Sequence, residues 1–343
     1  MLLTGKAGVV ARPAFSYHAF SRCFPQPNAS RRSKPVARVV SGVFGFPRLE
    51  YRASPLVALG FAIAALSTSA ILVRWSDAPS VIIALYRVTF TVLLLAPFVL
   101  TRYRADLGTL DLRDGAVAAL TGVALAVHFV AFFESLNWTS VAASVTLVQS
   151  QPLFVVLGAA LVLHERVGRR TVTGIAIALT GMVVMSVSDL ASGSAFAGTA
   201  LYGNALAVLG AVMAACYVLV GRSLRQRVAL LPYVLVVYTA CAIVLLGTAL
   251  GSGEPLVGYP PREWLLFLAM AIGPGLFGHT VVNWALAHVE SSVVSVSLLG
   301  EPLGATFLAL VLLAEVPGLT TVIGGAIVLS GIYVTSRTHR HRG

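Results

Sequence analysis

Two prolines interrupt apolar segments of this chain, and polar side chains that could do chemistry lie beside both. Glu301 comes directly before Pro302, whereas Gln149 and Gln151 lie beside Pro152. A proline within a helix lacks an N–H donor and its ring clashes with the preceding turn, so backbone carbonyl groups are left unpaired. An acid next to such groups can bind a proton or a cation, whereas the neutral glutamines cannot titrate. We therefore predict a proton-binding site at Glu301. The alternative is that both prolines only bend their helices and that Glu301 forms a structural hydrogen bond.

Arg87 is a second candidate, because it lies seven residues into an apolar segment. This spacing puts it roughly 10 Å along a helix, where a charged group is costly to bury. A guanidinium at that depth could hold a carboxylate or phosphate of a substrate. The alternatives are a pairing with a helix-end carbonyl or an acid, and an extension of the side chain towards the membrane surface.

Further polar and aromatic candidates lie in the same kind of segment. His128 and His279 could accept protons in the physiological pH range, although histidines in a core more often have only a packing role. Asn283 is one helical turn from His279 and shares its face. Tyr86 and Trp284 could stack on a flat substrate, but aromatic residues near helix ends more often anchor a protein at the membrane interface.

The composition is that of a polytopic membrane protein. Of the 343 residues 57% are hydrophobic and 11% are charged, and the mean hydropathy of +0.88 lies well outside the range of soluble globular proteins. The net charge of +11 could suggest nucleic-acid binding, but the arginines after residue 54 lie mostly in short clusters between apolar segments, where membrane orientation is the simpler explanation. Cys216 and Cys241 lie in apolar segments and are expected to be small core residues. Neither a metal site nor a cofactor is predicted.

Apolar segments long enough to cross a bilayer alternate with short polar breaks from residue 55 onward. One of the breaks, with Ser76 and Asp77 before Pro79, is typical of a capped helix start. Gly273–Pro274–Gly275 should loosen another segment. We count ten predicted spans, at residues 55–75, 80–100, 114–134, 140–163, 170–188, 199–221, 231–251, 263–286, 291–314 and 319–336.

The chain is internally duplicated. Residues 136–181 align with residues 286–331 without a gap at an offset of 150, and 14 of the 46 positions are identical. Each copy contains the interrupting proline, a glutamate that closes the helix (Glu165 or Glu315) and a glycine pair that begins at Gly174 or Gly324 and should allow close helix packing.

These features predict an all-α polytopic membrane protein with ten transmembrane helices in two inverted five-helix repeats. The predicted parts are a basic, disordered tail (1–54), a first repeat (55–190), a second repeat (199–336) and a cytoplasmic tail (337–343). A transit peptide is the alternative reading of residues 1–54.

The loop arginines predict the orientation, because cytoplasmic loops are enriched in positive charge. Placing both termini inside puts twelve arginines of the loops and the C-terminal tail inside and two, Arg74 and Arg262, outside. Five helices per repeat is an odd number, so the second repeat must be inverted. In the first repeat the inner loop at residues 165–170 is rich in arginine. The corresponding loop of the second repeat, residues 315–320, has no positive charge. Paired inverted halves are typical of secondary transporters with a site at the midplane. The predicted location is the plasma (cell inner) membrane, with an organelle membrane as the alternative.

Several short motifs of the first half resemble the EamA-type domain of the drug/metabolite transporter superfamily, namely His128-Phe129, the run Ser135 to Ala142, Gln151-Pro152-Leu153-Phe154, Glu165-Arg166-Val167 and Gly174. The second half repeats the resemblance in Gly278-His279-Thr280, Asn283-Trp284-Ala285-Leu286, Glu301-Pro302 and Glu315. The resemblance covers residues 55–336. It implies a ten-helix transporter that moves small organic metabolites, often as a proton-coupled exporter, without ATP hydrolysis.

The predicted function is therefore that of a secondary active transporter, an exporter of a small organic metabolite or drug that is coupled to protons and works by alternating access. The alternatives are a facilitative channel and, less favoured, an intramembrane enzyme, for which no paired catalytic groups can be assembled. The expected partners are a small-molecule substrate, protons or another coupling ion and the lipid bilayer, with a homodimer as a further option and no nucleic acid.

Overall fold

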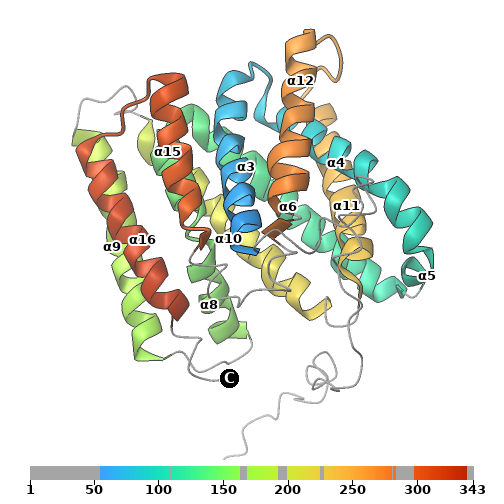
Figure 1. Cartoon of the computed structure of the whole chain (residues 1–343), viewed down its shortest axis with the longest axis horizontal. Coiled ribbons are helices and arrows are strands. Elements are labelled where there is room, and N and C mark those ends of the chain that lie inside the picture. Colours follow the sequence, from blue (N-terminus) through green and yellow to red (C-terminus); the bar gives the residue numbers. More distant parts are fainter. Residues whose placement is uncertain are drawn as a thin grey trace, which may run out of the picture. The chain divides into compact units, whose positions relative to one another are not determined.

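The computed structural model describes residues 55–108, 110–162, 168–191, 199–224, 228–279, 281–282 and 297–337, and every regular element in these residues is a helix (Figure 1). Six helical segments of the described residues are long and apolar enough to cross a membrane, one of them, Val141–Gly158, being made of two consecutive helices, and shorter apolar helices accompany them. The predicted class, an all-α polytopic membrane protein, is confirmed. The count of ten spans and the inversion of the second repeat stay predictions, because parts of the predicted spans lie outside the described residues.

The described helices follow the predicted segments closely. The first half contains α3 (Pro55–Trp75), α4 (Ser80–Arg102), α6 (Leu112–Trp138), α7 (Val141–Val148), α8 (Gln151–Val162) and α9 (Arg169–Ala191). The second half contains α10 (Ala200–Leu224), α11 (Leu230–Gly251), α12 (Pro261–Met270), the π-helix η2 (Ala271–His279), α15 (Gly300–Leu313) and α16 (Leu319–Arg337). A short helix that the sequence pattern did not predict, α5 (Arg104–Leu107), follows α4.

The start of α4 differs from the predicted capping. The helix begins at Ser80 with Pro79 in the capping position, and no side chain caps it. The Ser76 hydroxyl donates instead to the carboxylate of Glu263, which also accepts from the Asp77 backbone N–H at 3.1 Å. The capping prediction is wrong because a buried acid on α12 offers Ser76 a charge-assisted hydrogen bond, which is stronger than a neutral cap.

The first proline break divides one predicted span into two helices. The Ser140 side chain caps α7 by accepting from the Ala143 backbone N–H at 3.1 Å. The helix then ends after eight residues, and α8 starts at Gln151 with Pro152 as its second residue, where the missing N–H does no harm. Gln149 therefore lies at a helix end within the predicted span.

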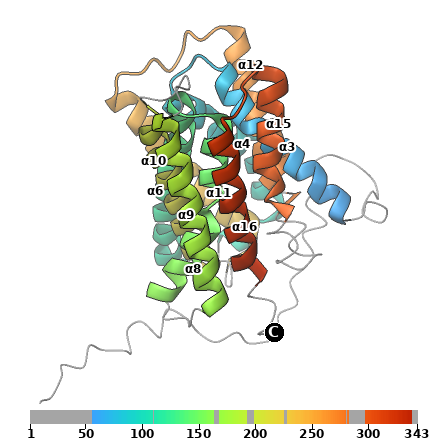
Figure 2. The ribbon, with the colours of Figure 1, turned by 90° about the vertical axis from the view of Figure 1, so that its left-hand side faces the viewer.

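The equivalent helices α9 and α16 of the two halves lie side by side (Figures 1 and 2). Their glycines make the close approach possible. A Cβ atom on Gly181 would lie 2.6 Å from the backbone nitrogen of Val328 and 2.7 Å from the carbonyl oxygen of Gly324, and a Cβ atom on Gly174 would lie 2.8 Å from the carbonyl oxygen of Gly331. The two backbones thus pack at distances that side chains would prevent.

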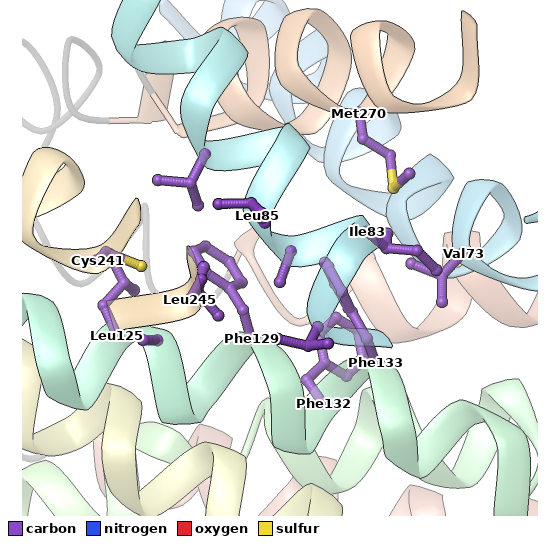
Figure 3. Packing of buried hydrophobic residues seen from close by; sticks show 14 of the residues in the cluster. Val73, Ile83, Leu85, Leu125, Phe129, Phe132, Phe133, Cys241, Leu245 and Met270 are labelled. Carbon is purple, nitrogen blue, oxygen red and sulfur yellow. The ribbon is translucent and has the colours of Figure 1, made fainter. Parts of the chain in front are cut away.

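The largest hydrophobic core lies between α3, α4, α6, α11 and α12. Figure 3 shows the part in which aromatic side chains of α6 face α4 and α11. Cys241 is fully buried there, as predicted, but Cys216 on α10 is exposed, so the prediction that Cys216 is a core residue is wrong. An apolar α10 has faces that need not pack against protein, because lipid can cover them. The labelled members of this core are Val73, Ile83, Leu85, Leu125, Phe129, Phe132, Phe133, Cys241, Leu245 and Met270.

Candidate functional site

The proline breaks of the two halves meet. The side-chain amide of Gln149, at the end of α7, donates a hydrogen bond to the carboxylate of Glu301, in the first turn of α15. Gln149 comes three residues before Pro152, and Glu301 one residue before Pro302. Interrupted helices at matching places of two halves of a membrane protein are a pointer to a binding site.

The helix α3 holds the backbone of Glu301. The single Ser67 hydroxyl proton is shared between the Glu301 carbonyl oxygen at 3.2 Å and the Ile63 carbonyl oxygen at 2.9 Å. Gly304, one turn further along α15, lies so close to Ser67 that a Cβ atom there would collide with the hydroxyl. Because the backbone of Glu301 is fixed in this way, the half-buried carboxylate has a defined position beside Gln149.

Arg87 lies in the aromatic core and is 4% exposed. Its Nη1 donates to the Ser69 hydroxyl at 3.0 Å, and its Cζ atom lies 4.7 Å from the ring centroid of Phe129 and 5.5 Å from that of Phe133. Aromatic faces stabilise a guanidinium by the cation–π interaction but do not neutralise its charge. In the part of the chain that the structure describes, no carboxylate lies within ion-pair distance of Arg87. Its charge does interact with Glu301 across a longer distance.

Both candidate histidines belong to the same electrostatic group. His128 lies beside Phe129 and Phe132, and its Nδ1–H donates to the Gly210 carbonyl at 2.9 Å. His279 is the last residue of the π-helix η2, which contains Pro274 at the segment that was predicted to be loose. Both histidines lie within electrostatic range of Arg87, and His279 also lies within electrostatic range of His128. Arg87, Glu301, His128 and His279 lie on four different elements, α4, α15, α6 and η2, and α4 packs against both α6 and η2.

Other sequence candidates lie apart from this group or outside the described residues. Tyr86 stacks on Phe267 with ring centroids 5.1 Å apart, and its hydroxyl donates to the Leu256 carbonyl, so it faces α12. Consecutive residues of a helix point about 100° apart, which explains why Tyr86 and Arg87 have different neighbours. Gln151 is half-buried. Asn283, Trp284 and Glu165 lie outside the described residues.

Sequence reasoning missed four contributors to the site, namely Ser67, Ser69, Phe129 and Phe133. The two serines are hydroxyl groups in a strongly apolar helix, which is a usable signal because buried hydroxyl groups need partners. The two phenylalanines are four residues apart and therefore share one face of α6. No sequence pattern, however, says that this face contacts Arg87.

A match to a protein-family model identifies the family of this chain. The model of the EamA-like transporter family matches residues 52–187 and again residues 201–337. The chain belongs to the EamA-like transporter family. The predicted resemblance is thereby confirmed, and the chain is a multi-pass membrane protein of a transporter family.

Relatives of this EamA-like transporter carry transporter names. It is 32% identical over 197 residues to an uncharacterized transporter of Archaeoglobus fulgidus, an alignment that covers 54% of this chain and 64% of the relative. It is 26% identical over 223 residues to the pseudopaline exporter CntI of Pseudomonas aeruginosa, covering 64% of this chain and 74% of the relative. The first alignment thus spans a little under two thirds of that relative's length. A solved crystal structure has the same fold, with a TM-score of 0.59 and 22% identity over 85% of this chain and 100% of the other.

Proposed function

We propose that this EamA-like transporter is a secondary active transporter that exports a small organic metabolite or drug in exchange for protons. The observation that carries the proposal is the hydrogen bond between Gln149 and Glu301 at the meeting point of the two proline breaks. Glu301 is the acid of this pair and can therefore bind and release a proton while the two halves move against each other. The exporter relative in Pseudomonas aeruginosa supports the direction of transport.

The charges of the site define what a substrate must offer. When Glu301 is ionised its charge balances that of Arg87, and when it is protonated the site has an excess positive charge. A substrate cation would compete with the proton for Glu301, which is the requirement for exchange of substrate against protons. A substrate carboxylate or phosphate would pair with Arg87, whose guanidinium has no acid partner at ion-pair distance in the described chain. A zwitterion would use both groups.

The experiment that tests this function uses the purified full-length protein in liposomes that contain a pH-sensitive dye. Amino acids, nucleobases and cationic drugs are added in turn, and proton movement is recorded. We expect at least one class to drive saturable proton movement that empty liposomes do not show. A facilitative channel would instead give substrate flux without saturation, without proton movement and without counterflow, and that result would overturn the proposal.

A further inference from the structure

Glu315 follows Ala314, the residue that caps the end of α15, and contacts two elements of the first half. One carboxylate oxygen accepts from the backbone N–H of Val141 at 2.6 Å, and the other pairs with Arg74 Nη2 at 3.2 Å. The same Arg74 nitrogen donates to the Thr139 carbonyl at 3.0 Å. A single acid of the second half thus connects the end of α3 to the start of α7. We call this end of the helices the Arg74 end.

The surroundings of Glu315 favour a strong contact. Val141 is the first residue of α7, where unpaired N–H groups and the helix dipole attract an anion. The side chains of Arg74 and Glu315 are only 19% and 17% exposed, so water screens their attraction weakly. The pair of Arg262 and Asp77 at the same end is very different, with side chains 59% and 90% exposed. Exposed ion pairs of this kind contribute little to the free energy of unfolding.

The backbone before Glu315 is held in an uncommon conformation. Ala314 has φ 51° and ψ 26°, which is the left-handed region that favours glycine. The Glu315 backbone N–H donates back to the Ala309 carbonyl at 3.2 Å. Directly after this left-handed residue, the Glu315 carboxylate reaches the first residue of α7. A strained backbone conformation is common at functional sites, and here it lies next to a contact between the two halves.

The Glu315 contact and the candidate site lie at opposite ends of the same two helices. The helices α7 and α15 pack against each other. Val141 and Glu315 join them at the Arg74 end, and Gln149 and Glu301 join them at the site. The two helices therefore run antiparallel and are connected at both ends. A separation of α7 from α15 at the Arg74 end would break the Glu315 contact.

We infer that Glu315 is a positioning residue that keeps the pathway from the site to the Arg74 end closed, by capping α7 and by pairing with Arg74. This inference rests on the proposed transport function, for which a closed and an open state of each end are required. Binding events at Glu301 act on one end of the α7 and α15 pair, and Glu315 opposes separation at the other end. Loss of the Glu315 contact therefore shifts the population towards the state that is open at the Arg74 end.

The test measures access to Ser67, which is 2% exposed, faces α15 and lies seven residues before Arg74 on α3. Ser67→Cys is introduced into the full-length protein after Cys23→Ser, Cys216→Ser and Cys241→Ala. A membrane-impermeant maleimide is then applied to sealed vesicles, from each side separately. We expect Glu315→Ala to raise the labelling rate from the Arg74 side at least about tenfold, because two charge-assisted contacts are lost. The matched control, Asp77→Asn in the exposed pair, should stay within about twofold of the parent.

Two further variants separate the helix cap from the ion pair. Glu315→Gln keeps an oxygen for the Val141 N–H but loses the charge, so its labelling rate should be intermediate. The charge swap Arg74→Glu with Glu315→Arg should not restore the parent rate, since an arginine cannot accept from the Val141 N–H. Restoration by the swap would assign the effect to the ion pair alone and contradict the role of the cap.

An unchanged labelling rate in Glu315→Ala would overturn the inference. An equal rise of the labelling rate from both sides would also overturn it, because such a rise indicates a general loss of packing. These outcomes are distinct from a failure of the proposed function. Labelling requires no substrate, whereas the proposed function fails when no substrate moves protons in the liposome assay.

Discussion

The side-chain amide of Gln149 in the first half of the chain donates a hydrogen bond to the carboxylate of Glu301 in the second half. The offset of the duplication pairs Gln149 with Leu299 and Gln151 with Glu301, so the contact joins two positions that the repeat does not relate. The asymmetry gives this contact one titratable group and one neutral partner. That partner orients the acid without competing for the proton.

The first prediction concerns this partner. We expect Gln149→Ala to reduce the rate of proton-driven transport by about tenfold, because a hydrogen bond to a charged group contributes about 1.5–3 kcal/mol. Gln151→Ala is the matched control, since Gln151 has no hydrogen bond to Glu301 in the described chain. Both variants are compared by initial rates in the liposome assay, and equal losses in the two would contradict the orienting role of Gln149.

The second prediction concerns Arg87. Arg87→Lys keeps the charge but loses the planar fork that binds a carboxylate with two hydrogen bonds. For a substrate that carries a carboxylate we expect KM to rise by about tenfold with a smaller change in the maximal rate, and Arg87→Gln to abolish saturable binding. The exposed arginine Arg104 provides the control in Arg104→Gln, which should leave KM unchanged. If KM is the same in Arg87→Gln and in the parent, the substrate anion does not bind there.

The third prediction concerns the contact of α9 with α16. Gly181→Ala would put a methyl group within 2.6–2.7 Å of the backbone of α16, and overpacking of this kind costs about 1–3 kcal/mol. We expect a lower midpoint of thermal unfolding for the purified protein in detergent. Gly247→Ala on α11 is the control, because no atom lies within 4 Å of the added Cβ and alanine favours the helix. The idea of close backbone packing fails if Gly181→Ala is as stable as Gly247→Ala.

The fourth prediction tests the inverted orientation of the two repeats. Arg169 and Leu319 are the first residues of the equivalent helices α9 and α16, and both are exposed. The arginine distribution puts Leu319 outside and Arg169 inside. In intact cells that express the full-length protein, an impermeant thiol reagent should label Leu319→Cys and not Arg169→Cys. Equal labelling of the two positions would contradict the inversion.

Much of the fold could be predicted from the sequence because bilayer thickness sets the length of apolar helices. The bounds of α3 and α11 lie within one residue of the predicted segments, and Pro152 divides its span as expected. Local sequence signals gave a wrong prediction where a residue distant in sequence offers a stronger hydrogen-bond partner. Ser76 is an ordinary candidate for a helix cap, but Glu263, 187 residues away in sequence, takes its hydrogen bond.

The sequence predicts which residues belong to the candidate site but not which residues they contact. Glu301 and Arg87 stand out as ionisable groups in apolar segments, which is a property of composition alone. The contact of Glu301 with Gln149, and of Arg87 with Phe129, depends on how helices of different segments pack, and no alternation or spacing encodes it. Glu315 shows the same limit, because the sequence predicts a residue that closes a helix, whereas the structure adds its contacts with Val141 and Arg74.

The measurement that tests the central claim most directly is transport by the Glu301→Gln variant. Glutamine keeps the size of the side chain and its capacity for hydrogen bonds, including a bond to Gln149, but it cannot bind and release a proton. We predict a folded protein in liposomes that still exchanges substrate for substrate and no longer accumulates or expels substrate against a gradient when a proton gradient is imposed. Full proton-driven transport by Glu301→Gln would contradict the account, and the coupling group would then have to be sought at His279 or His128 with the same substitution.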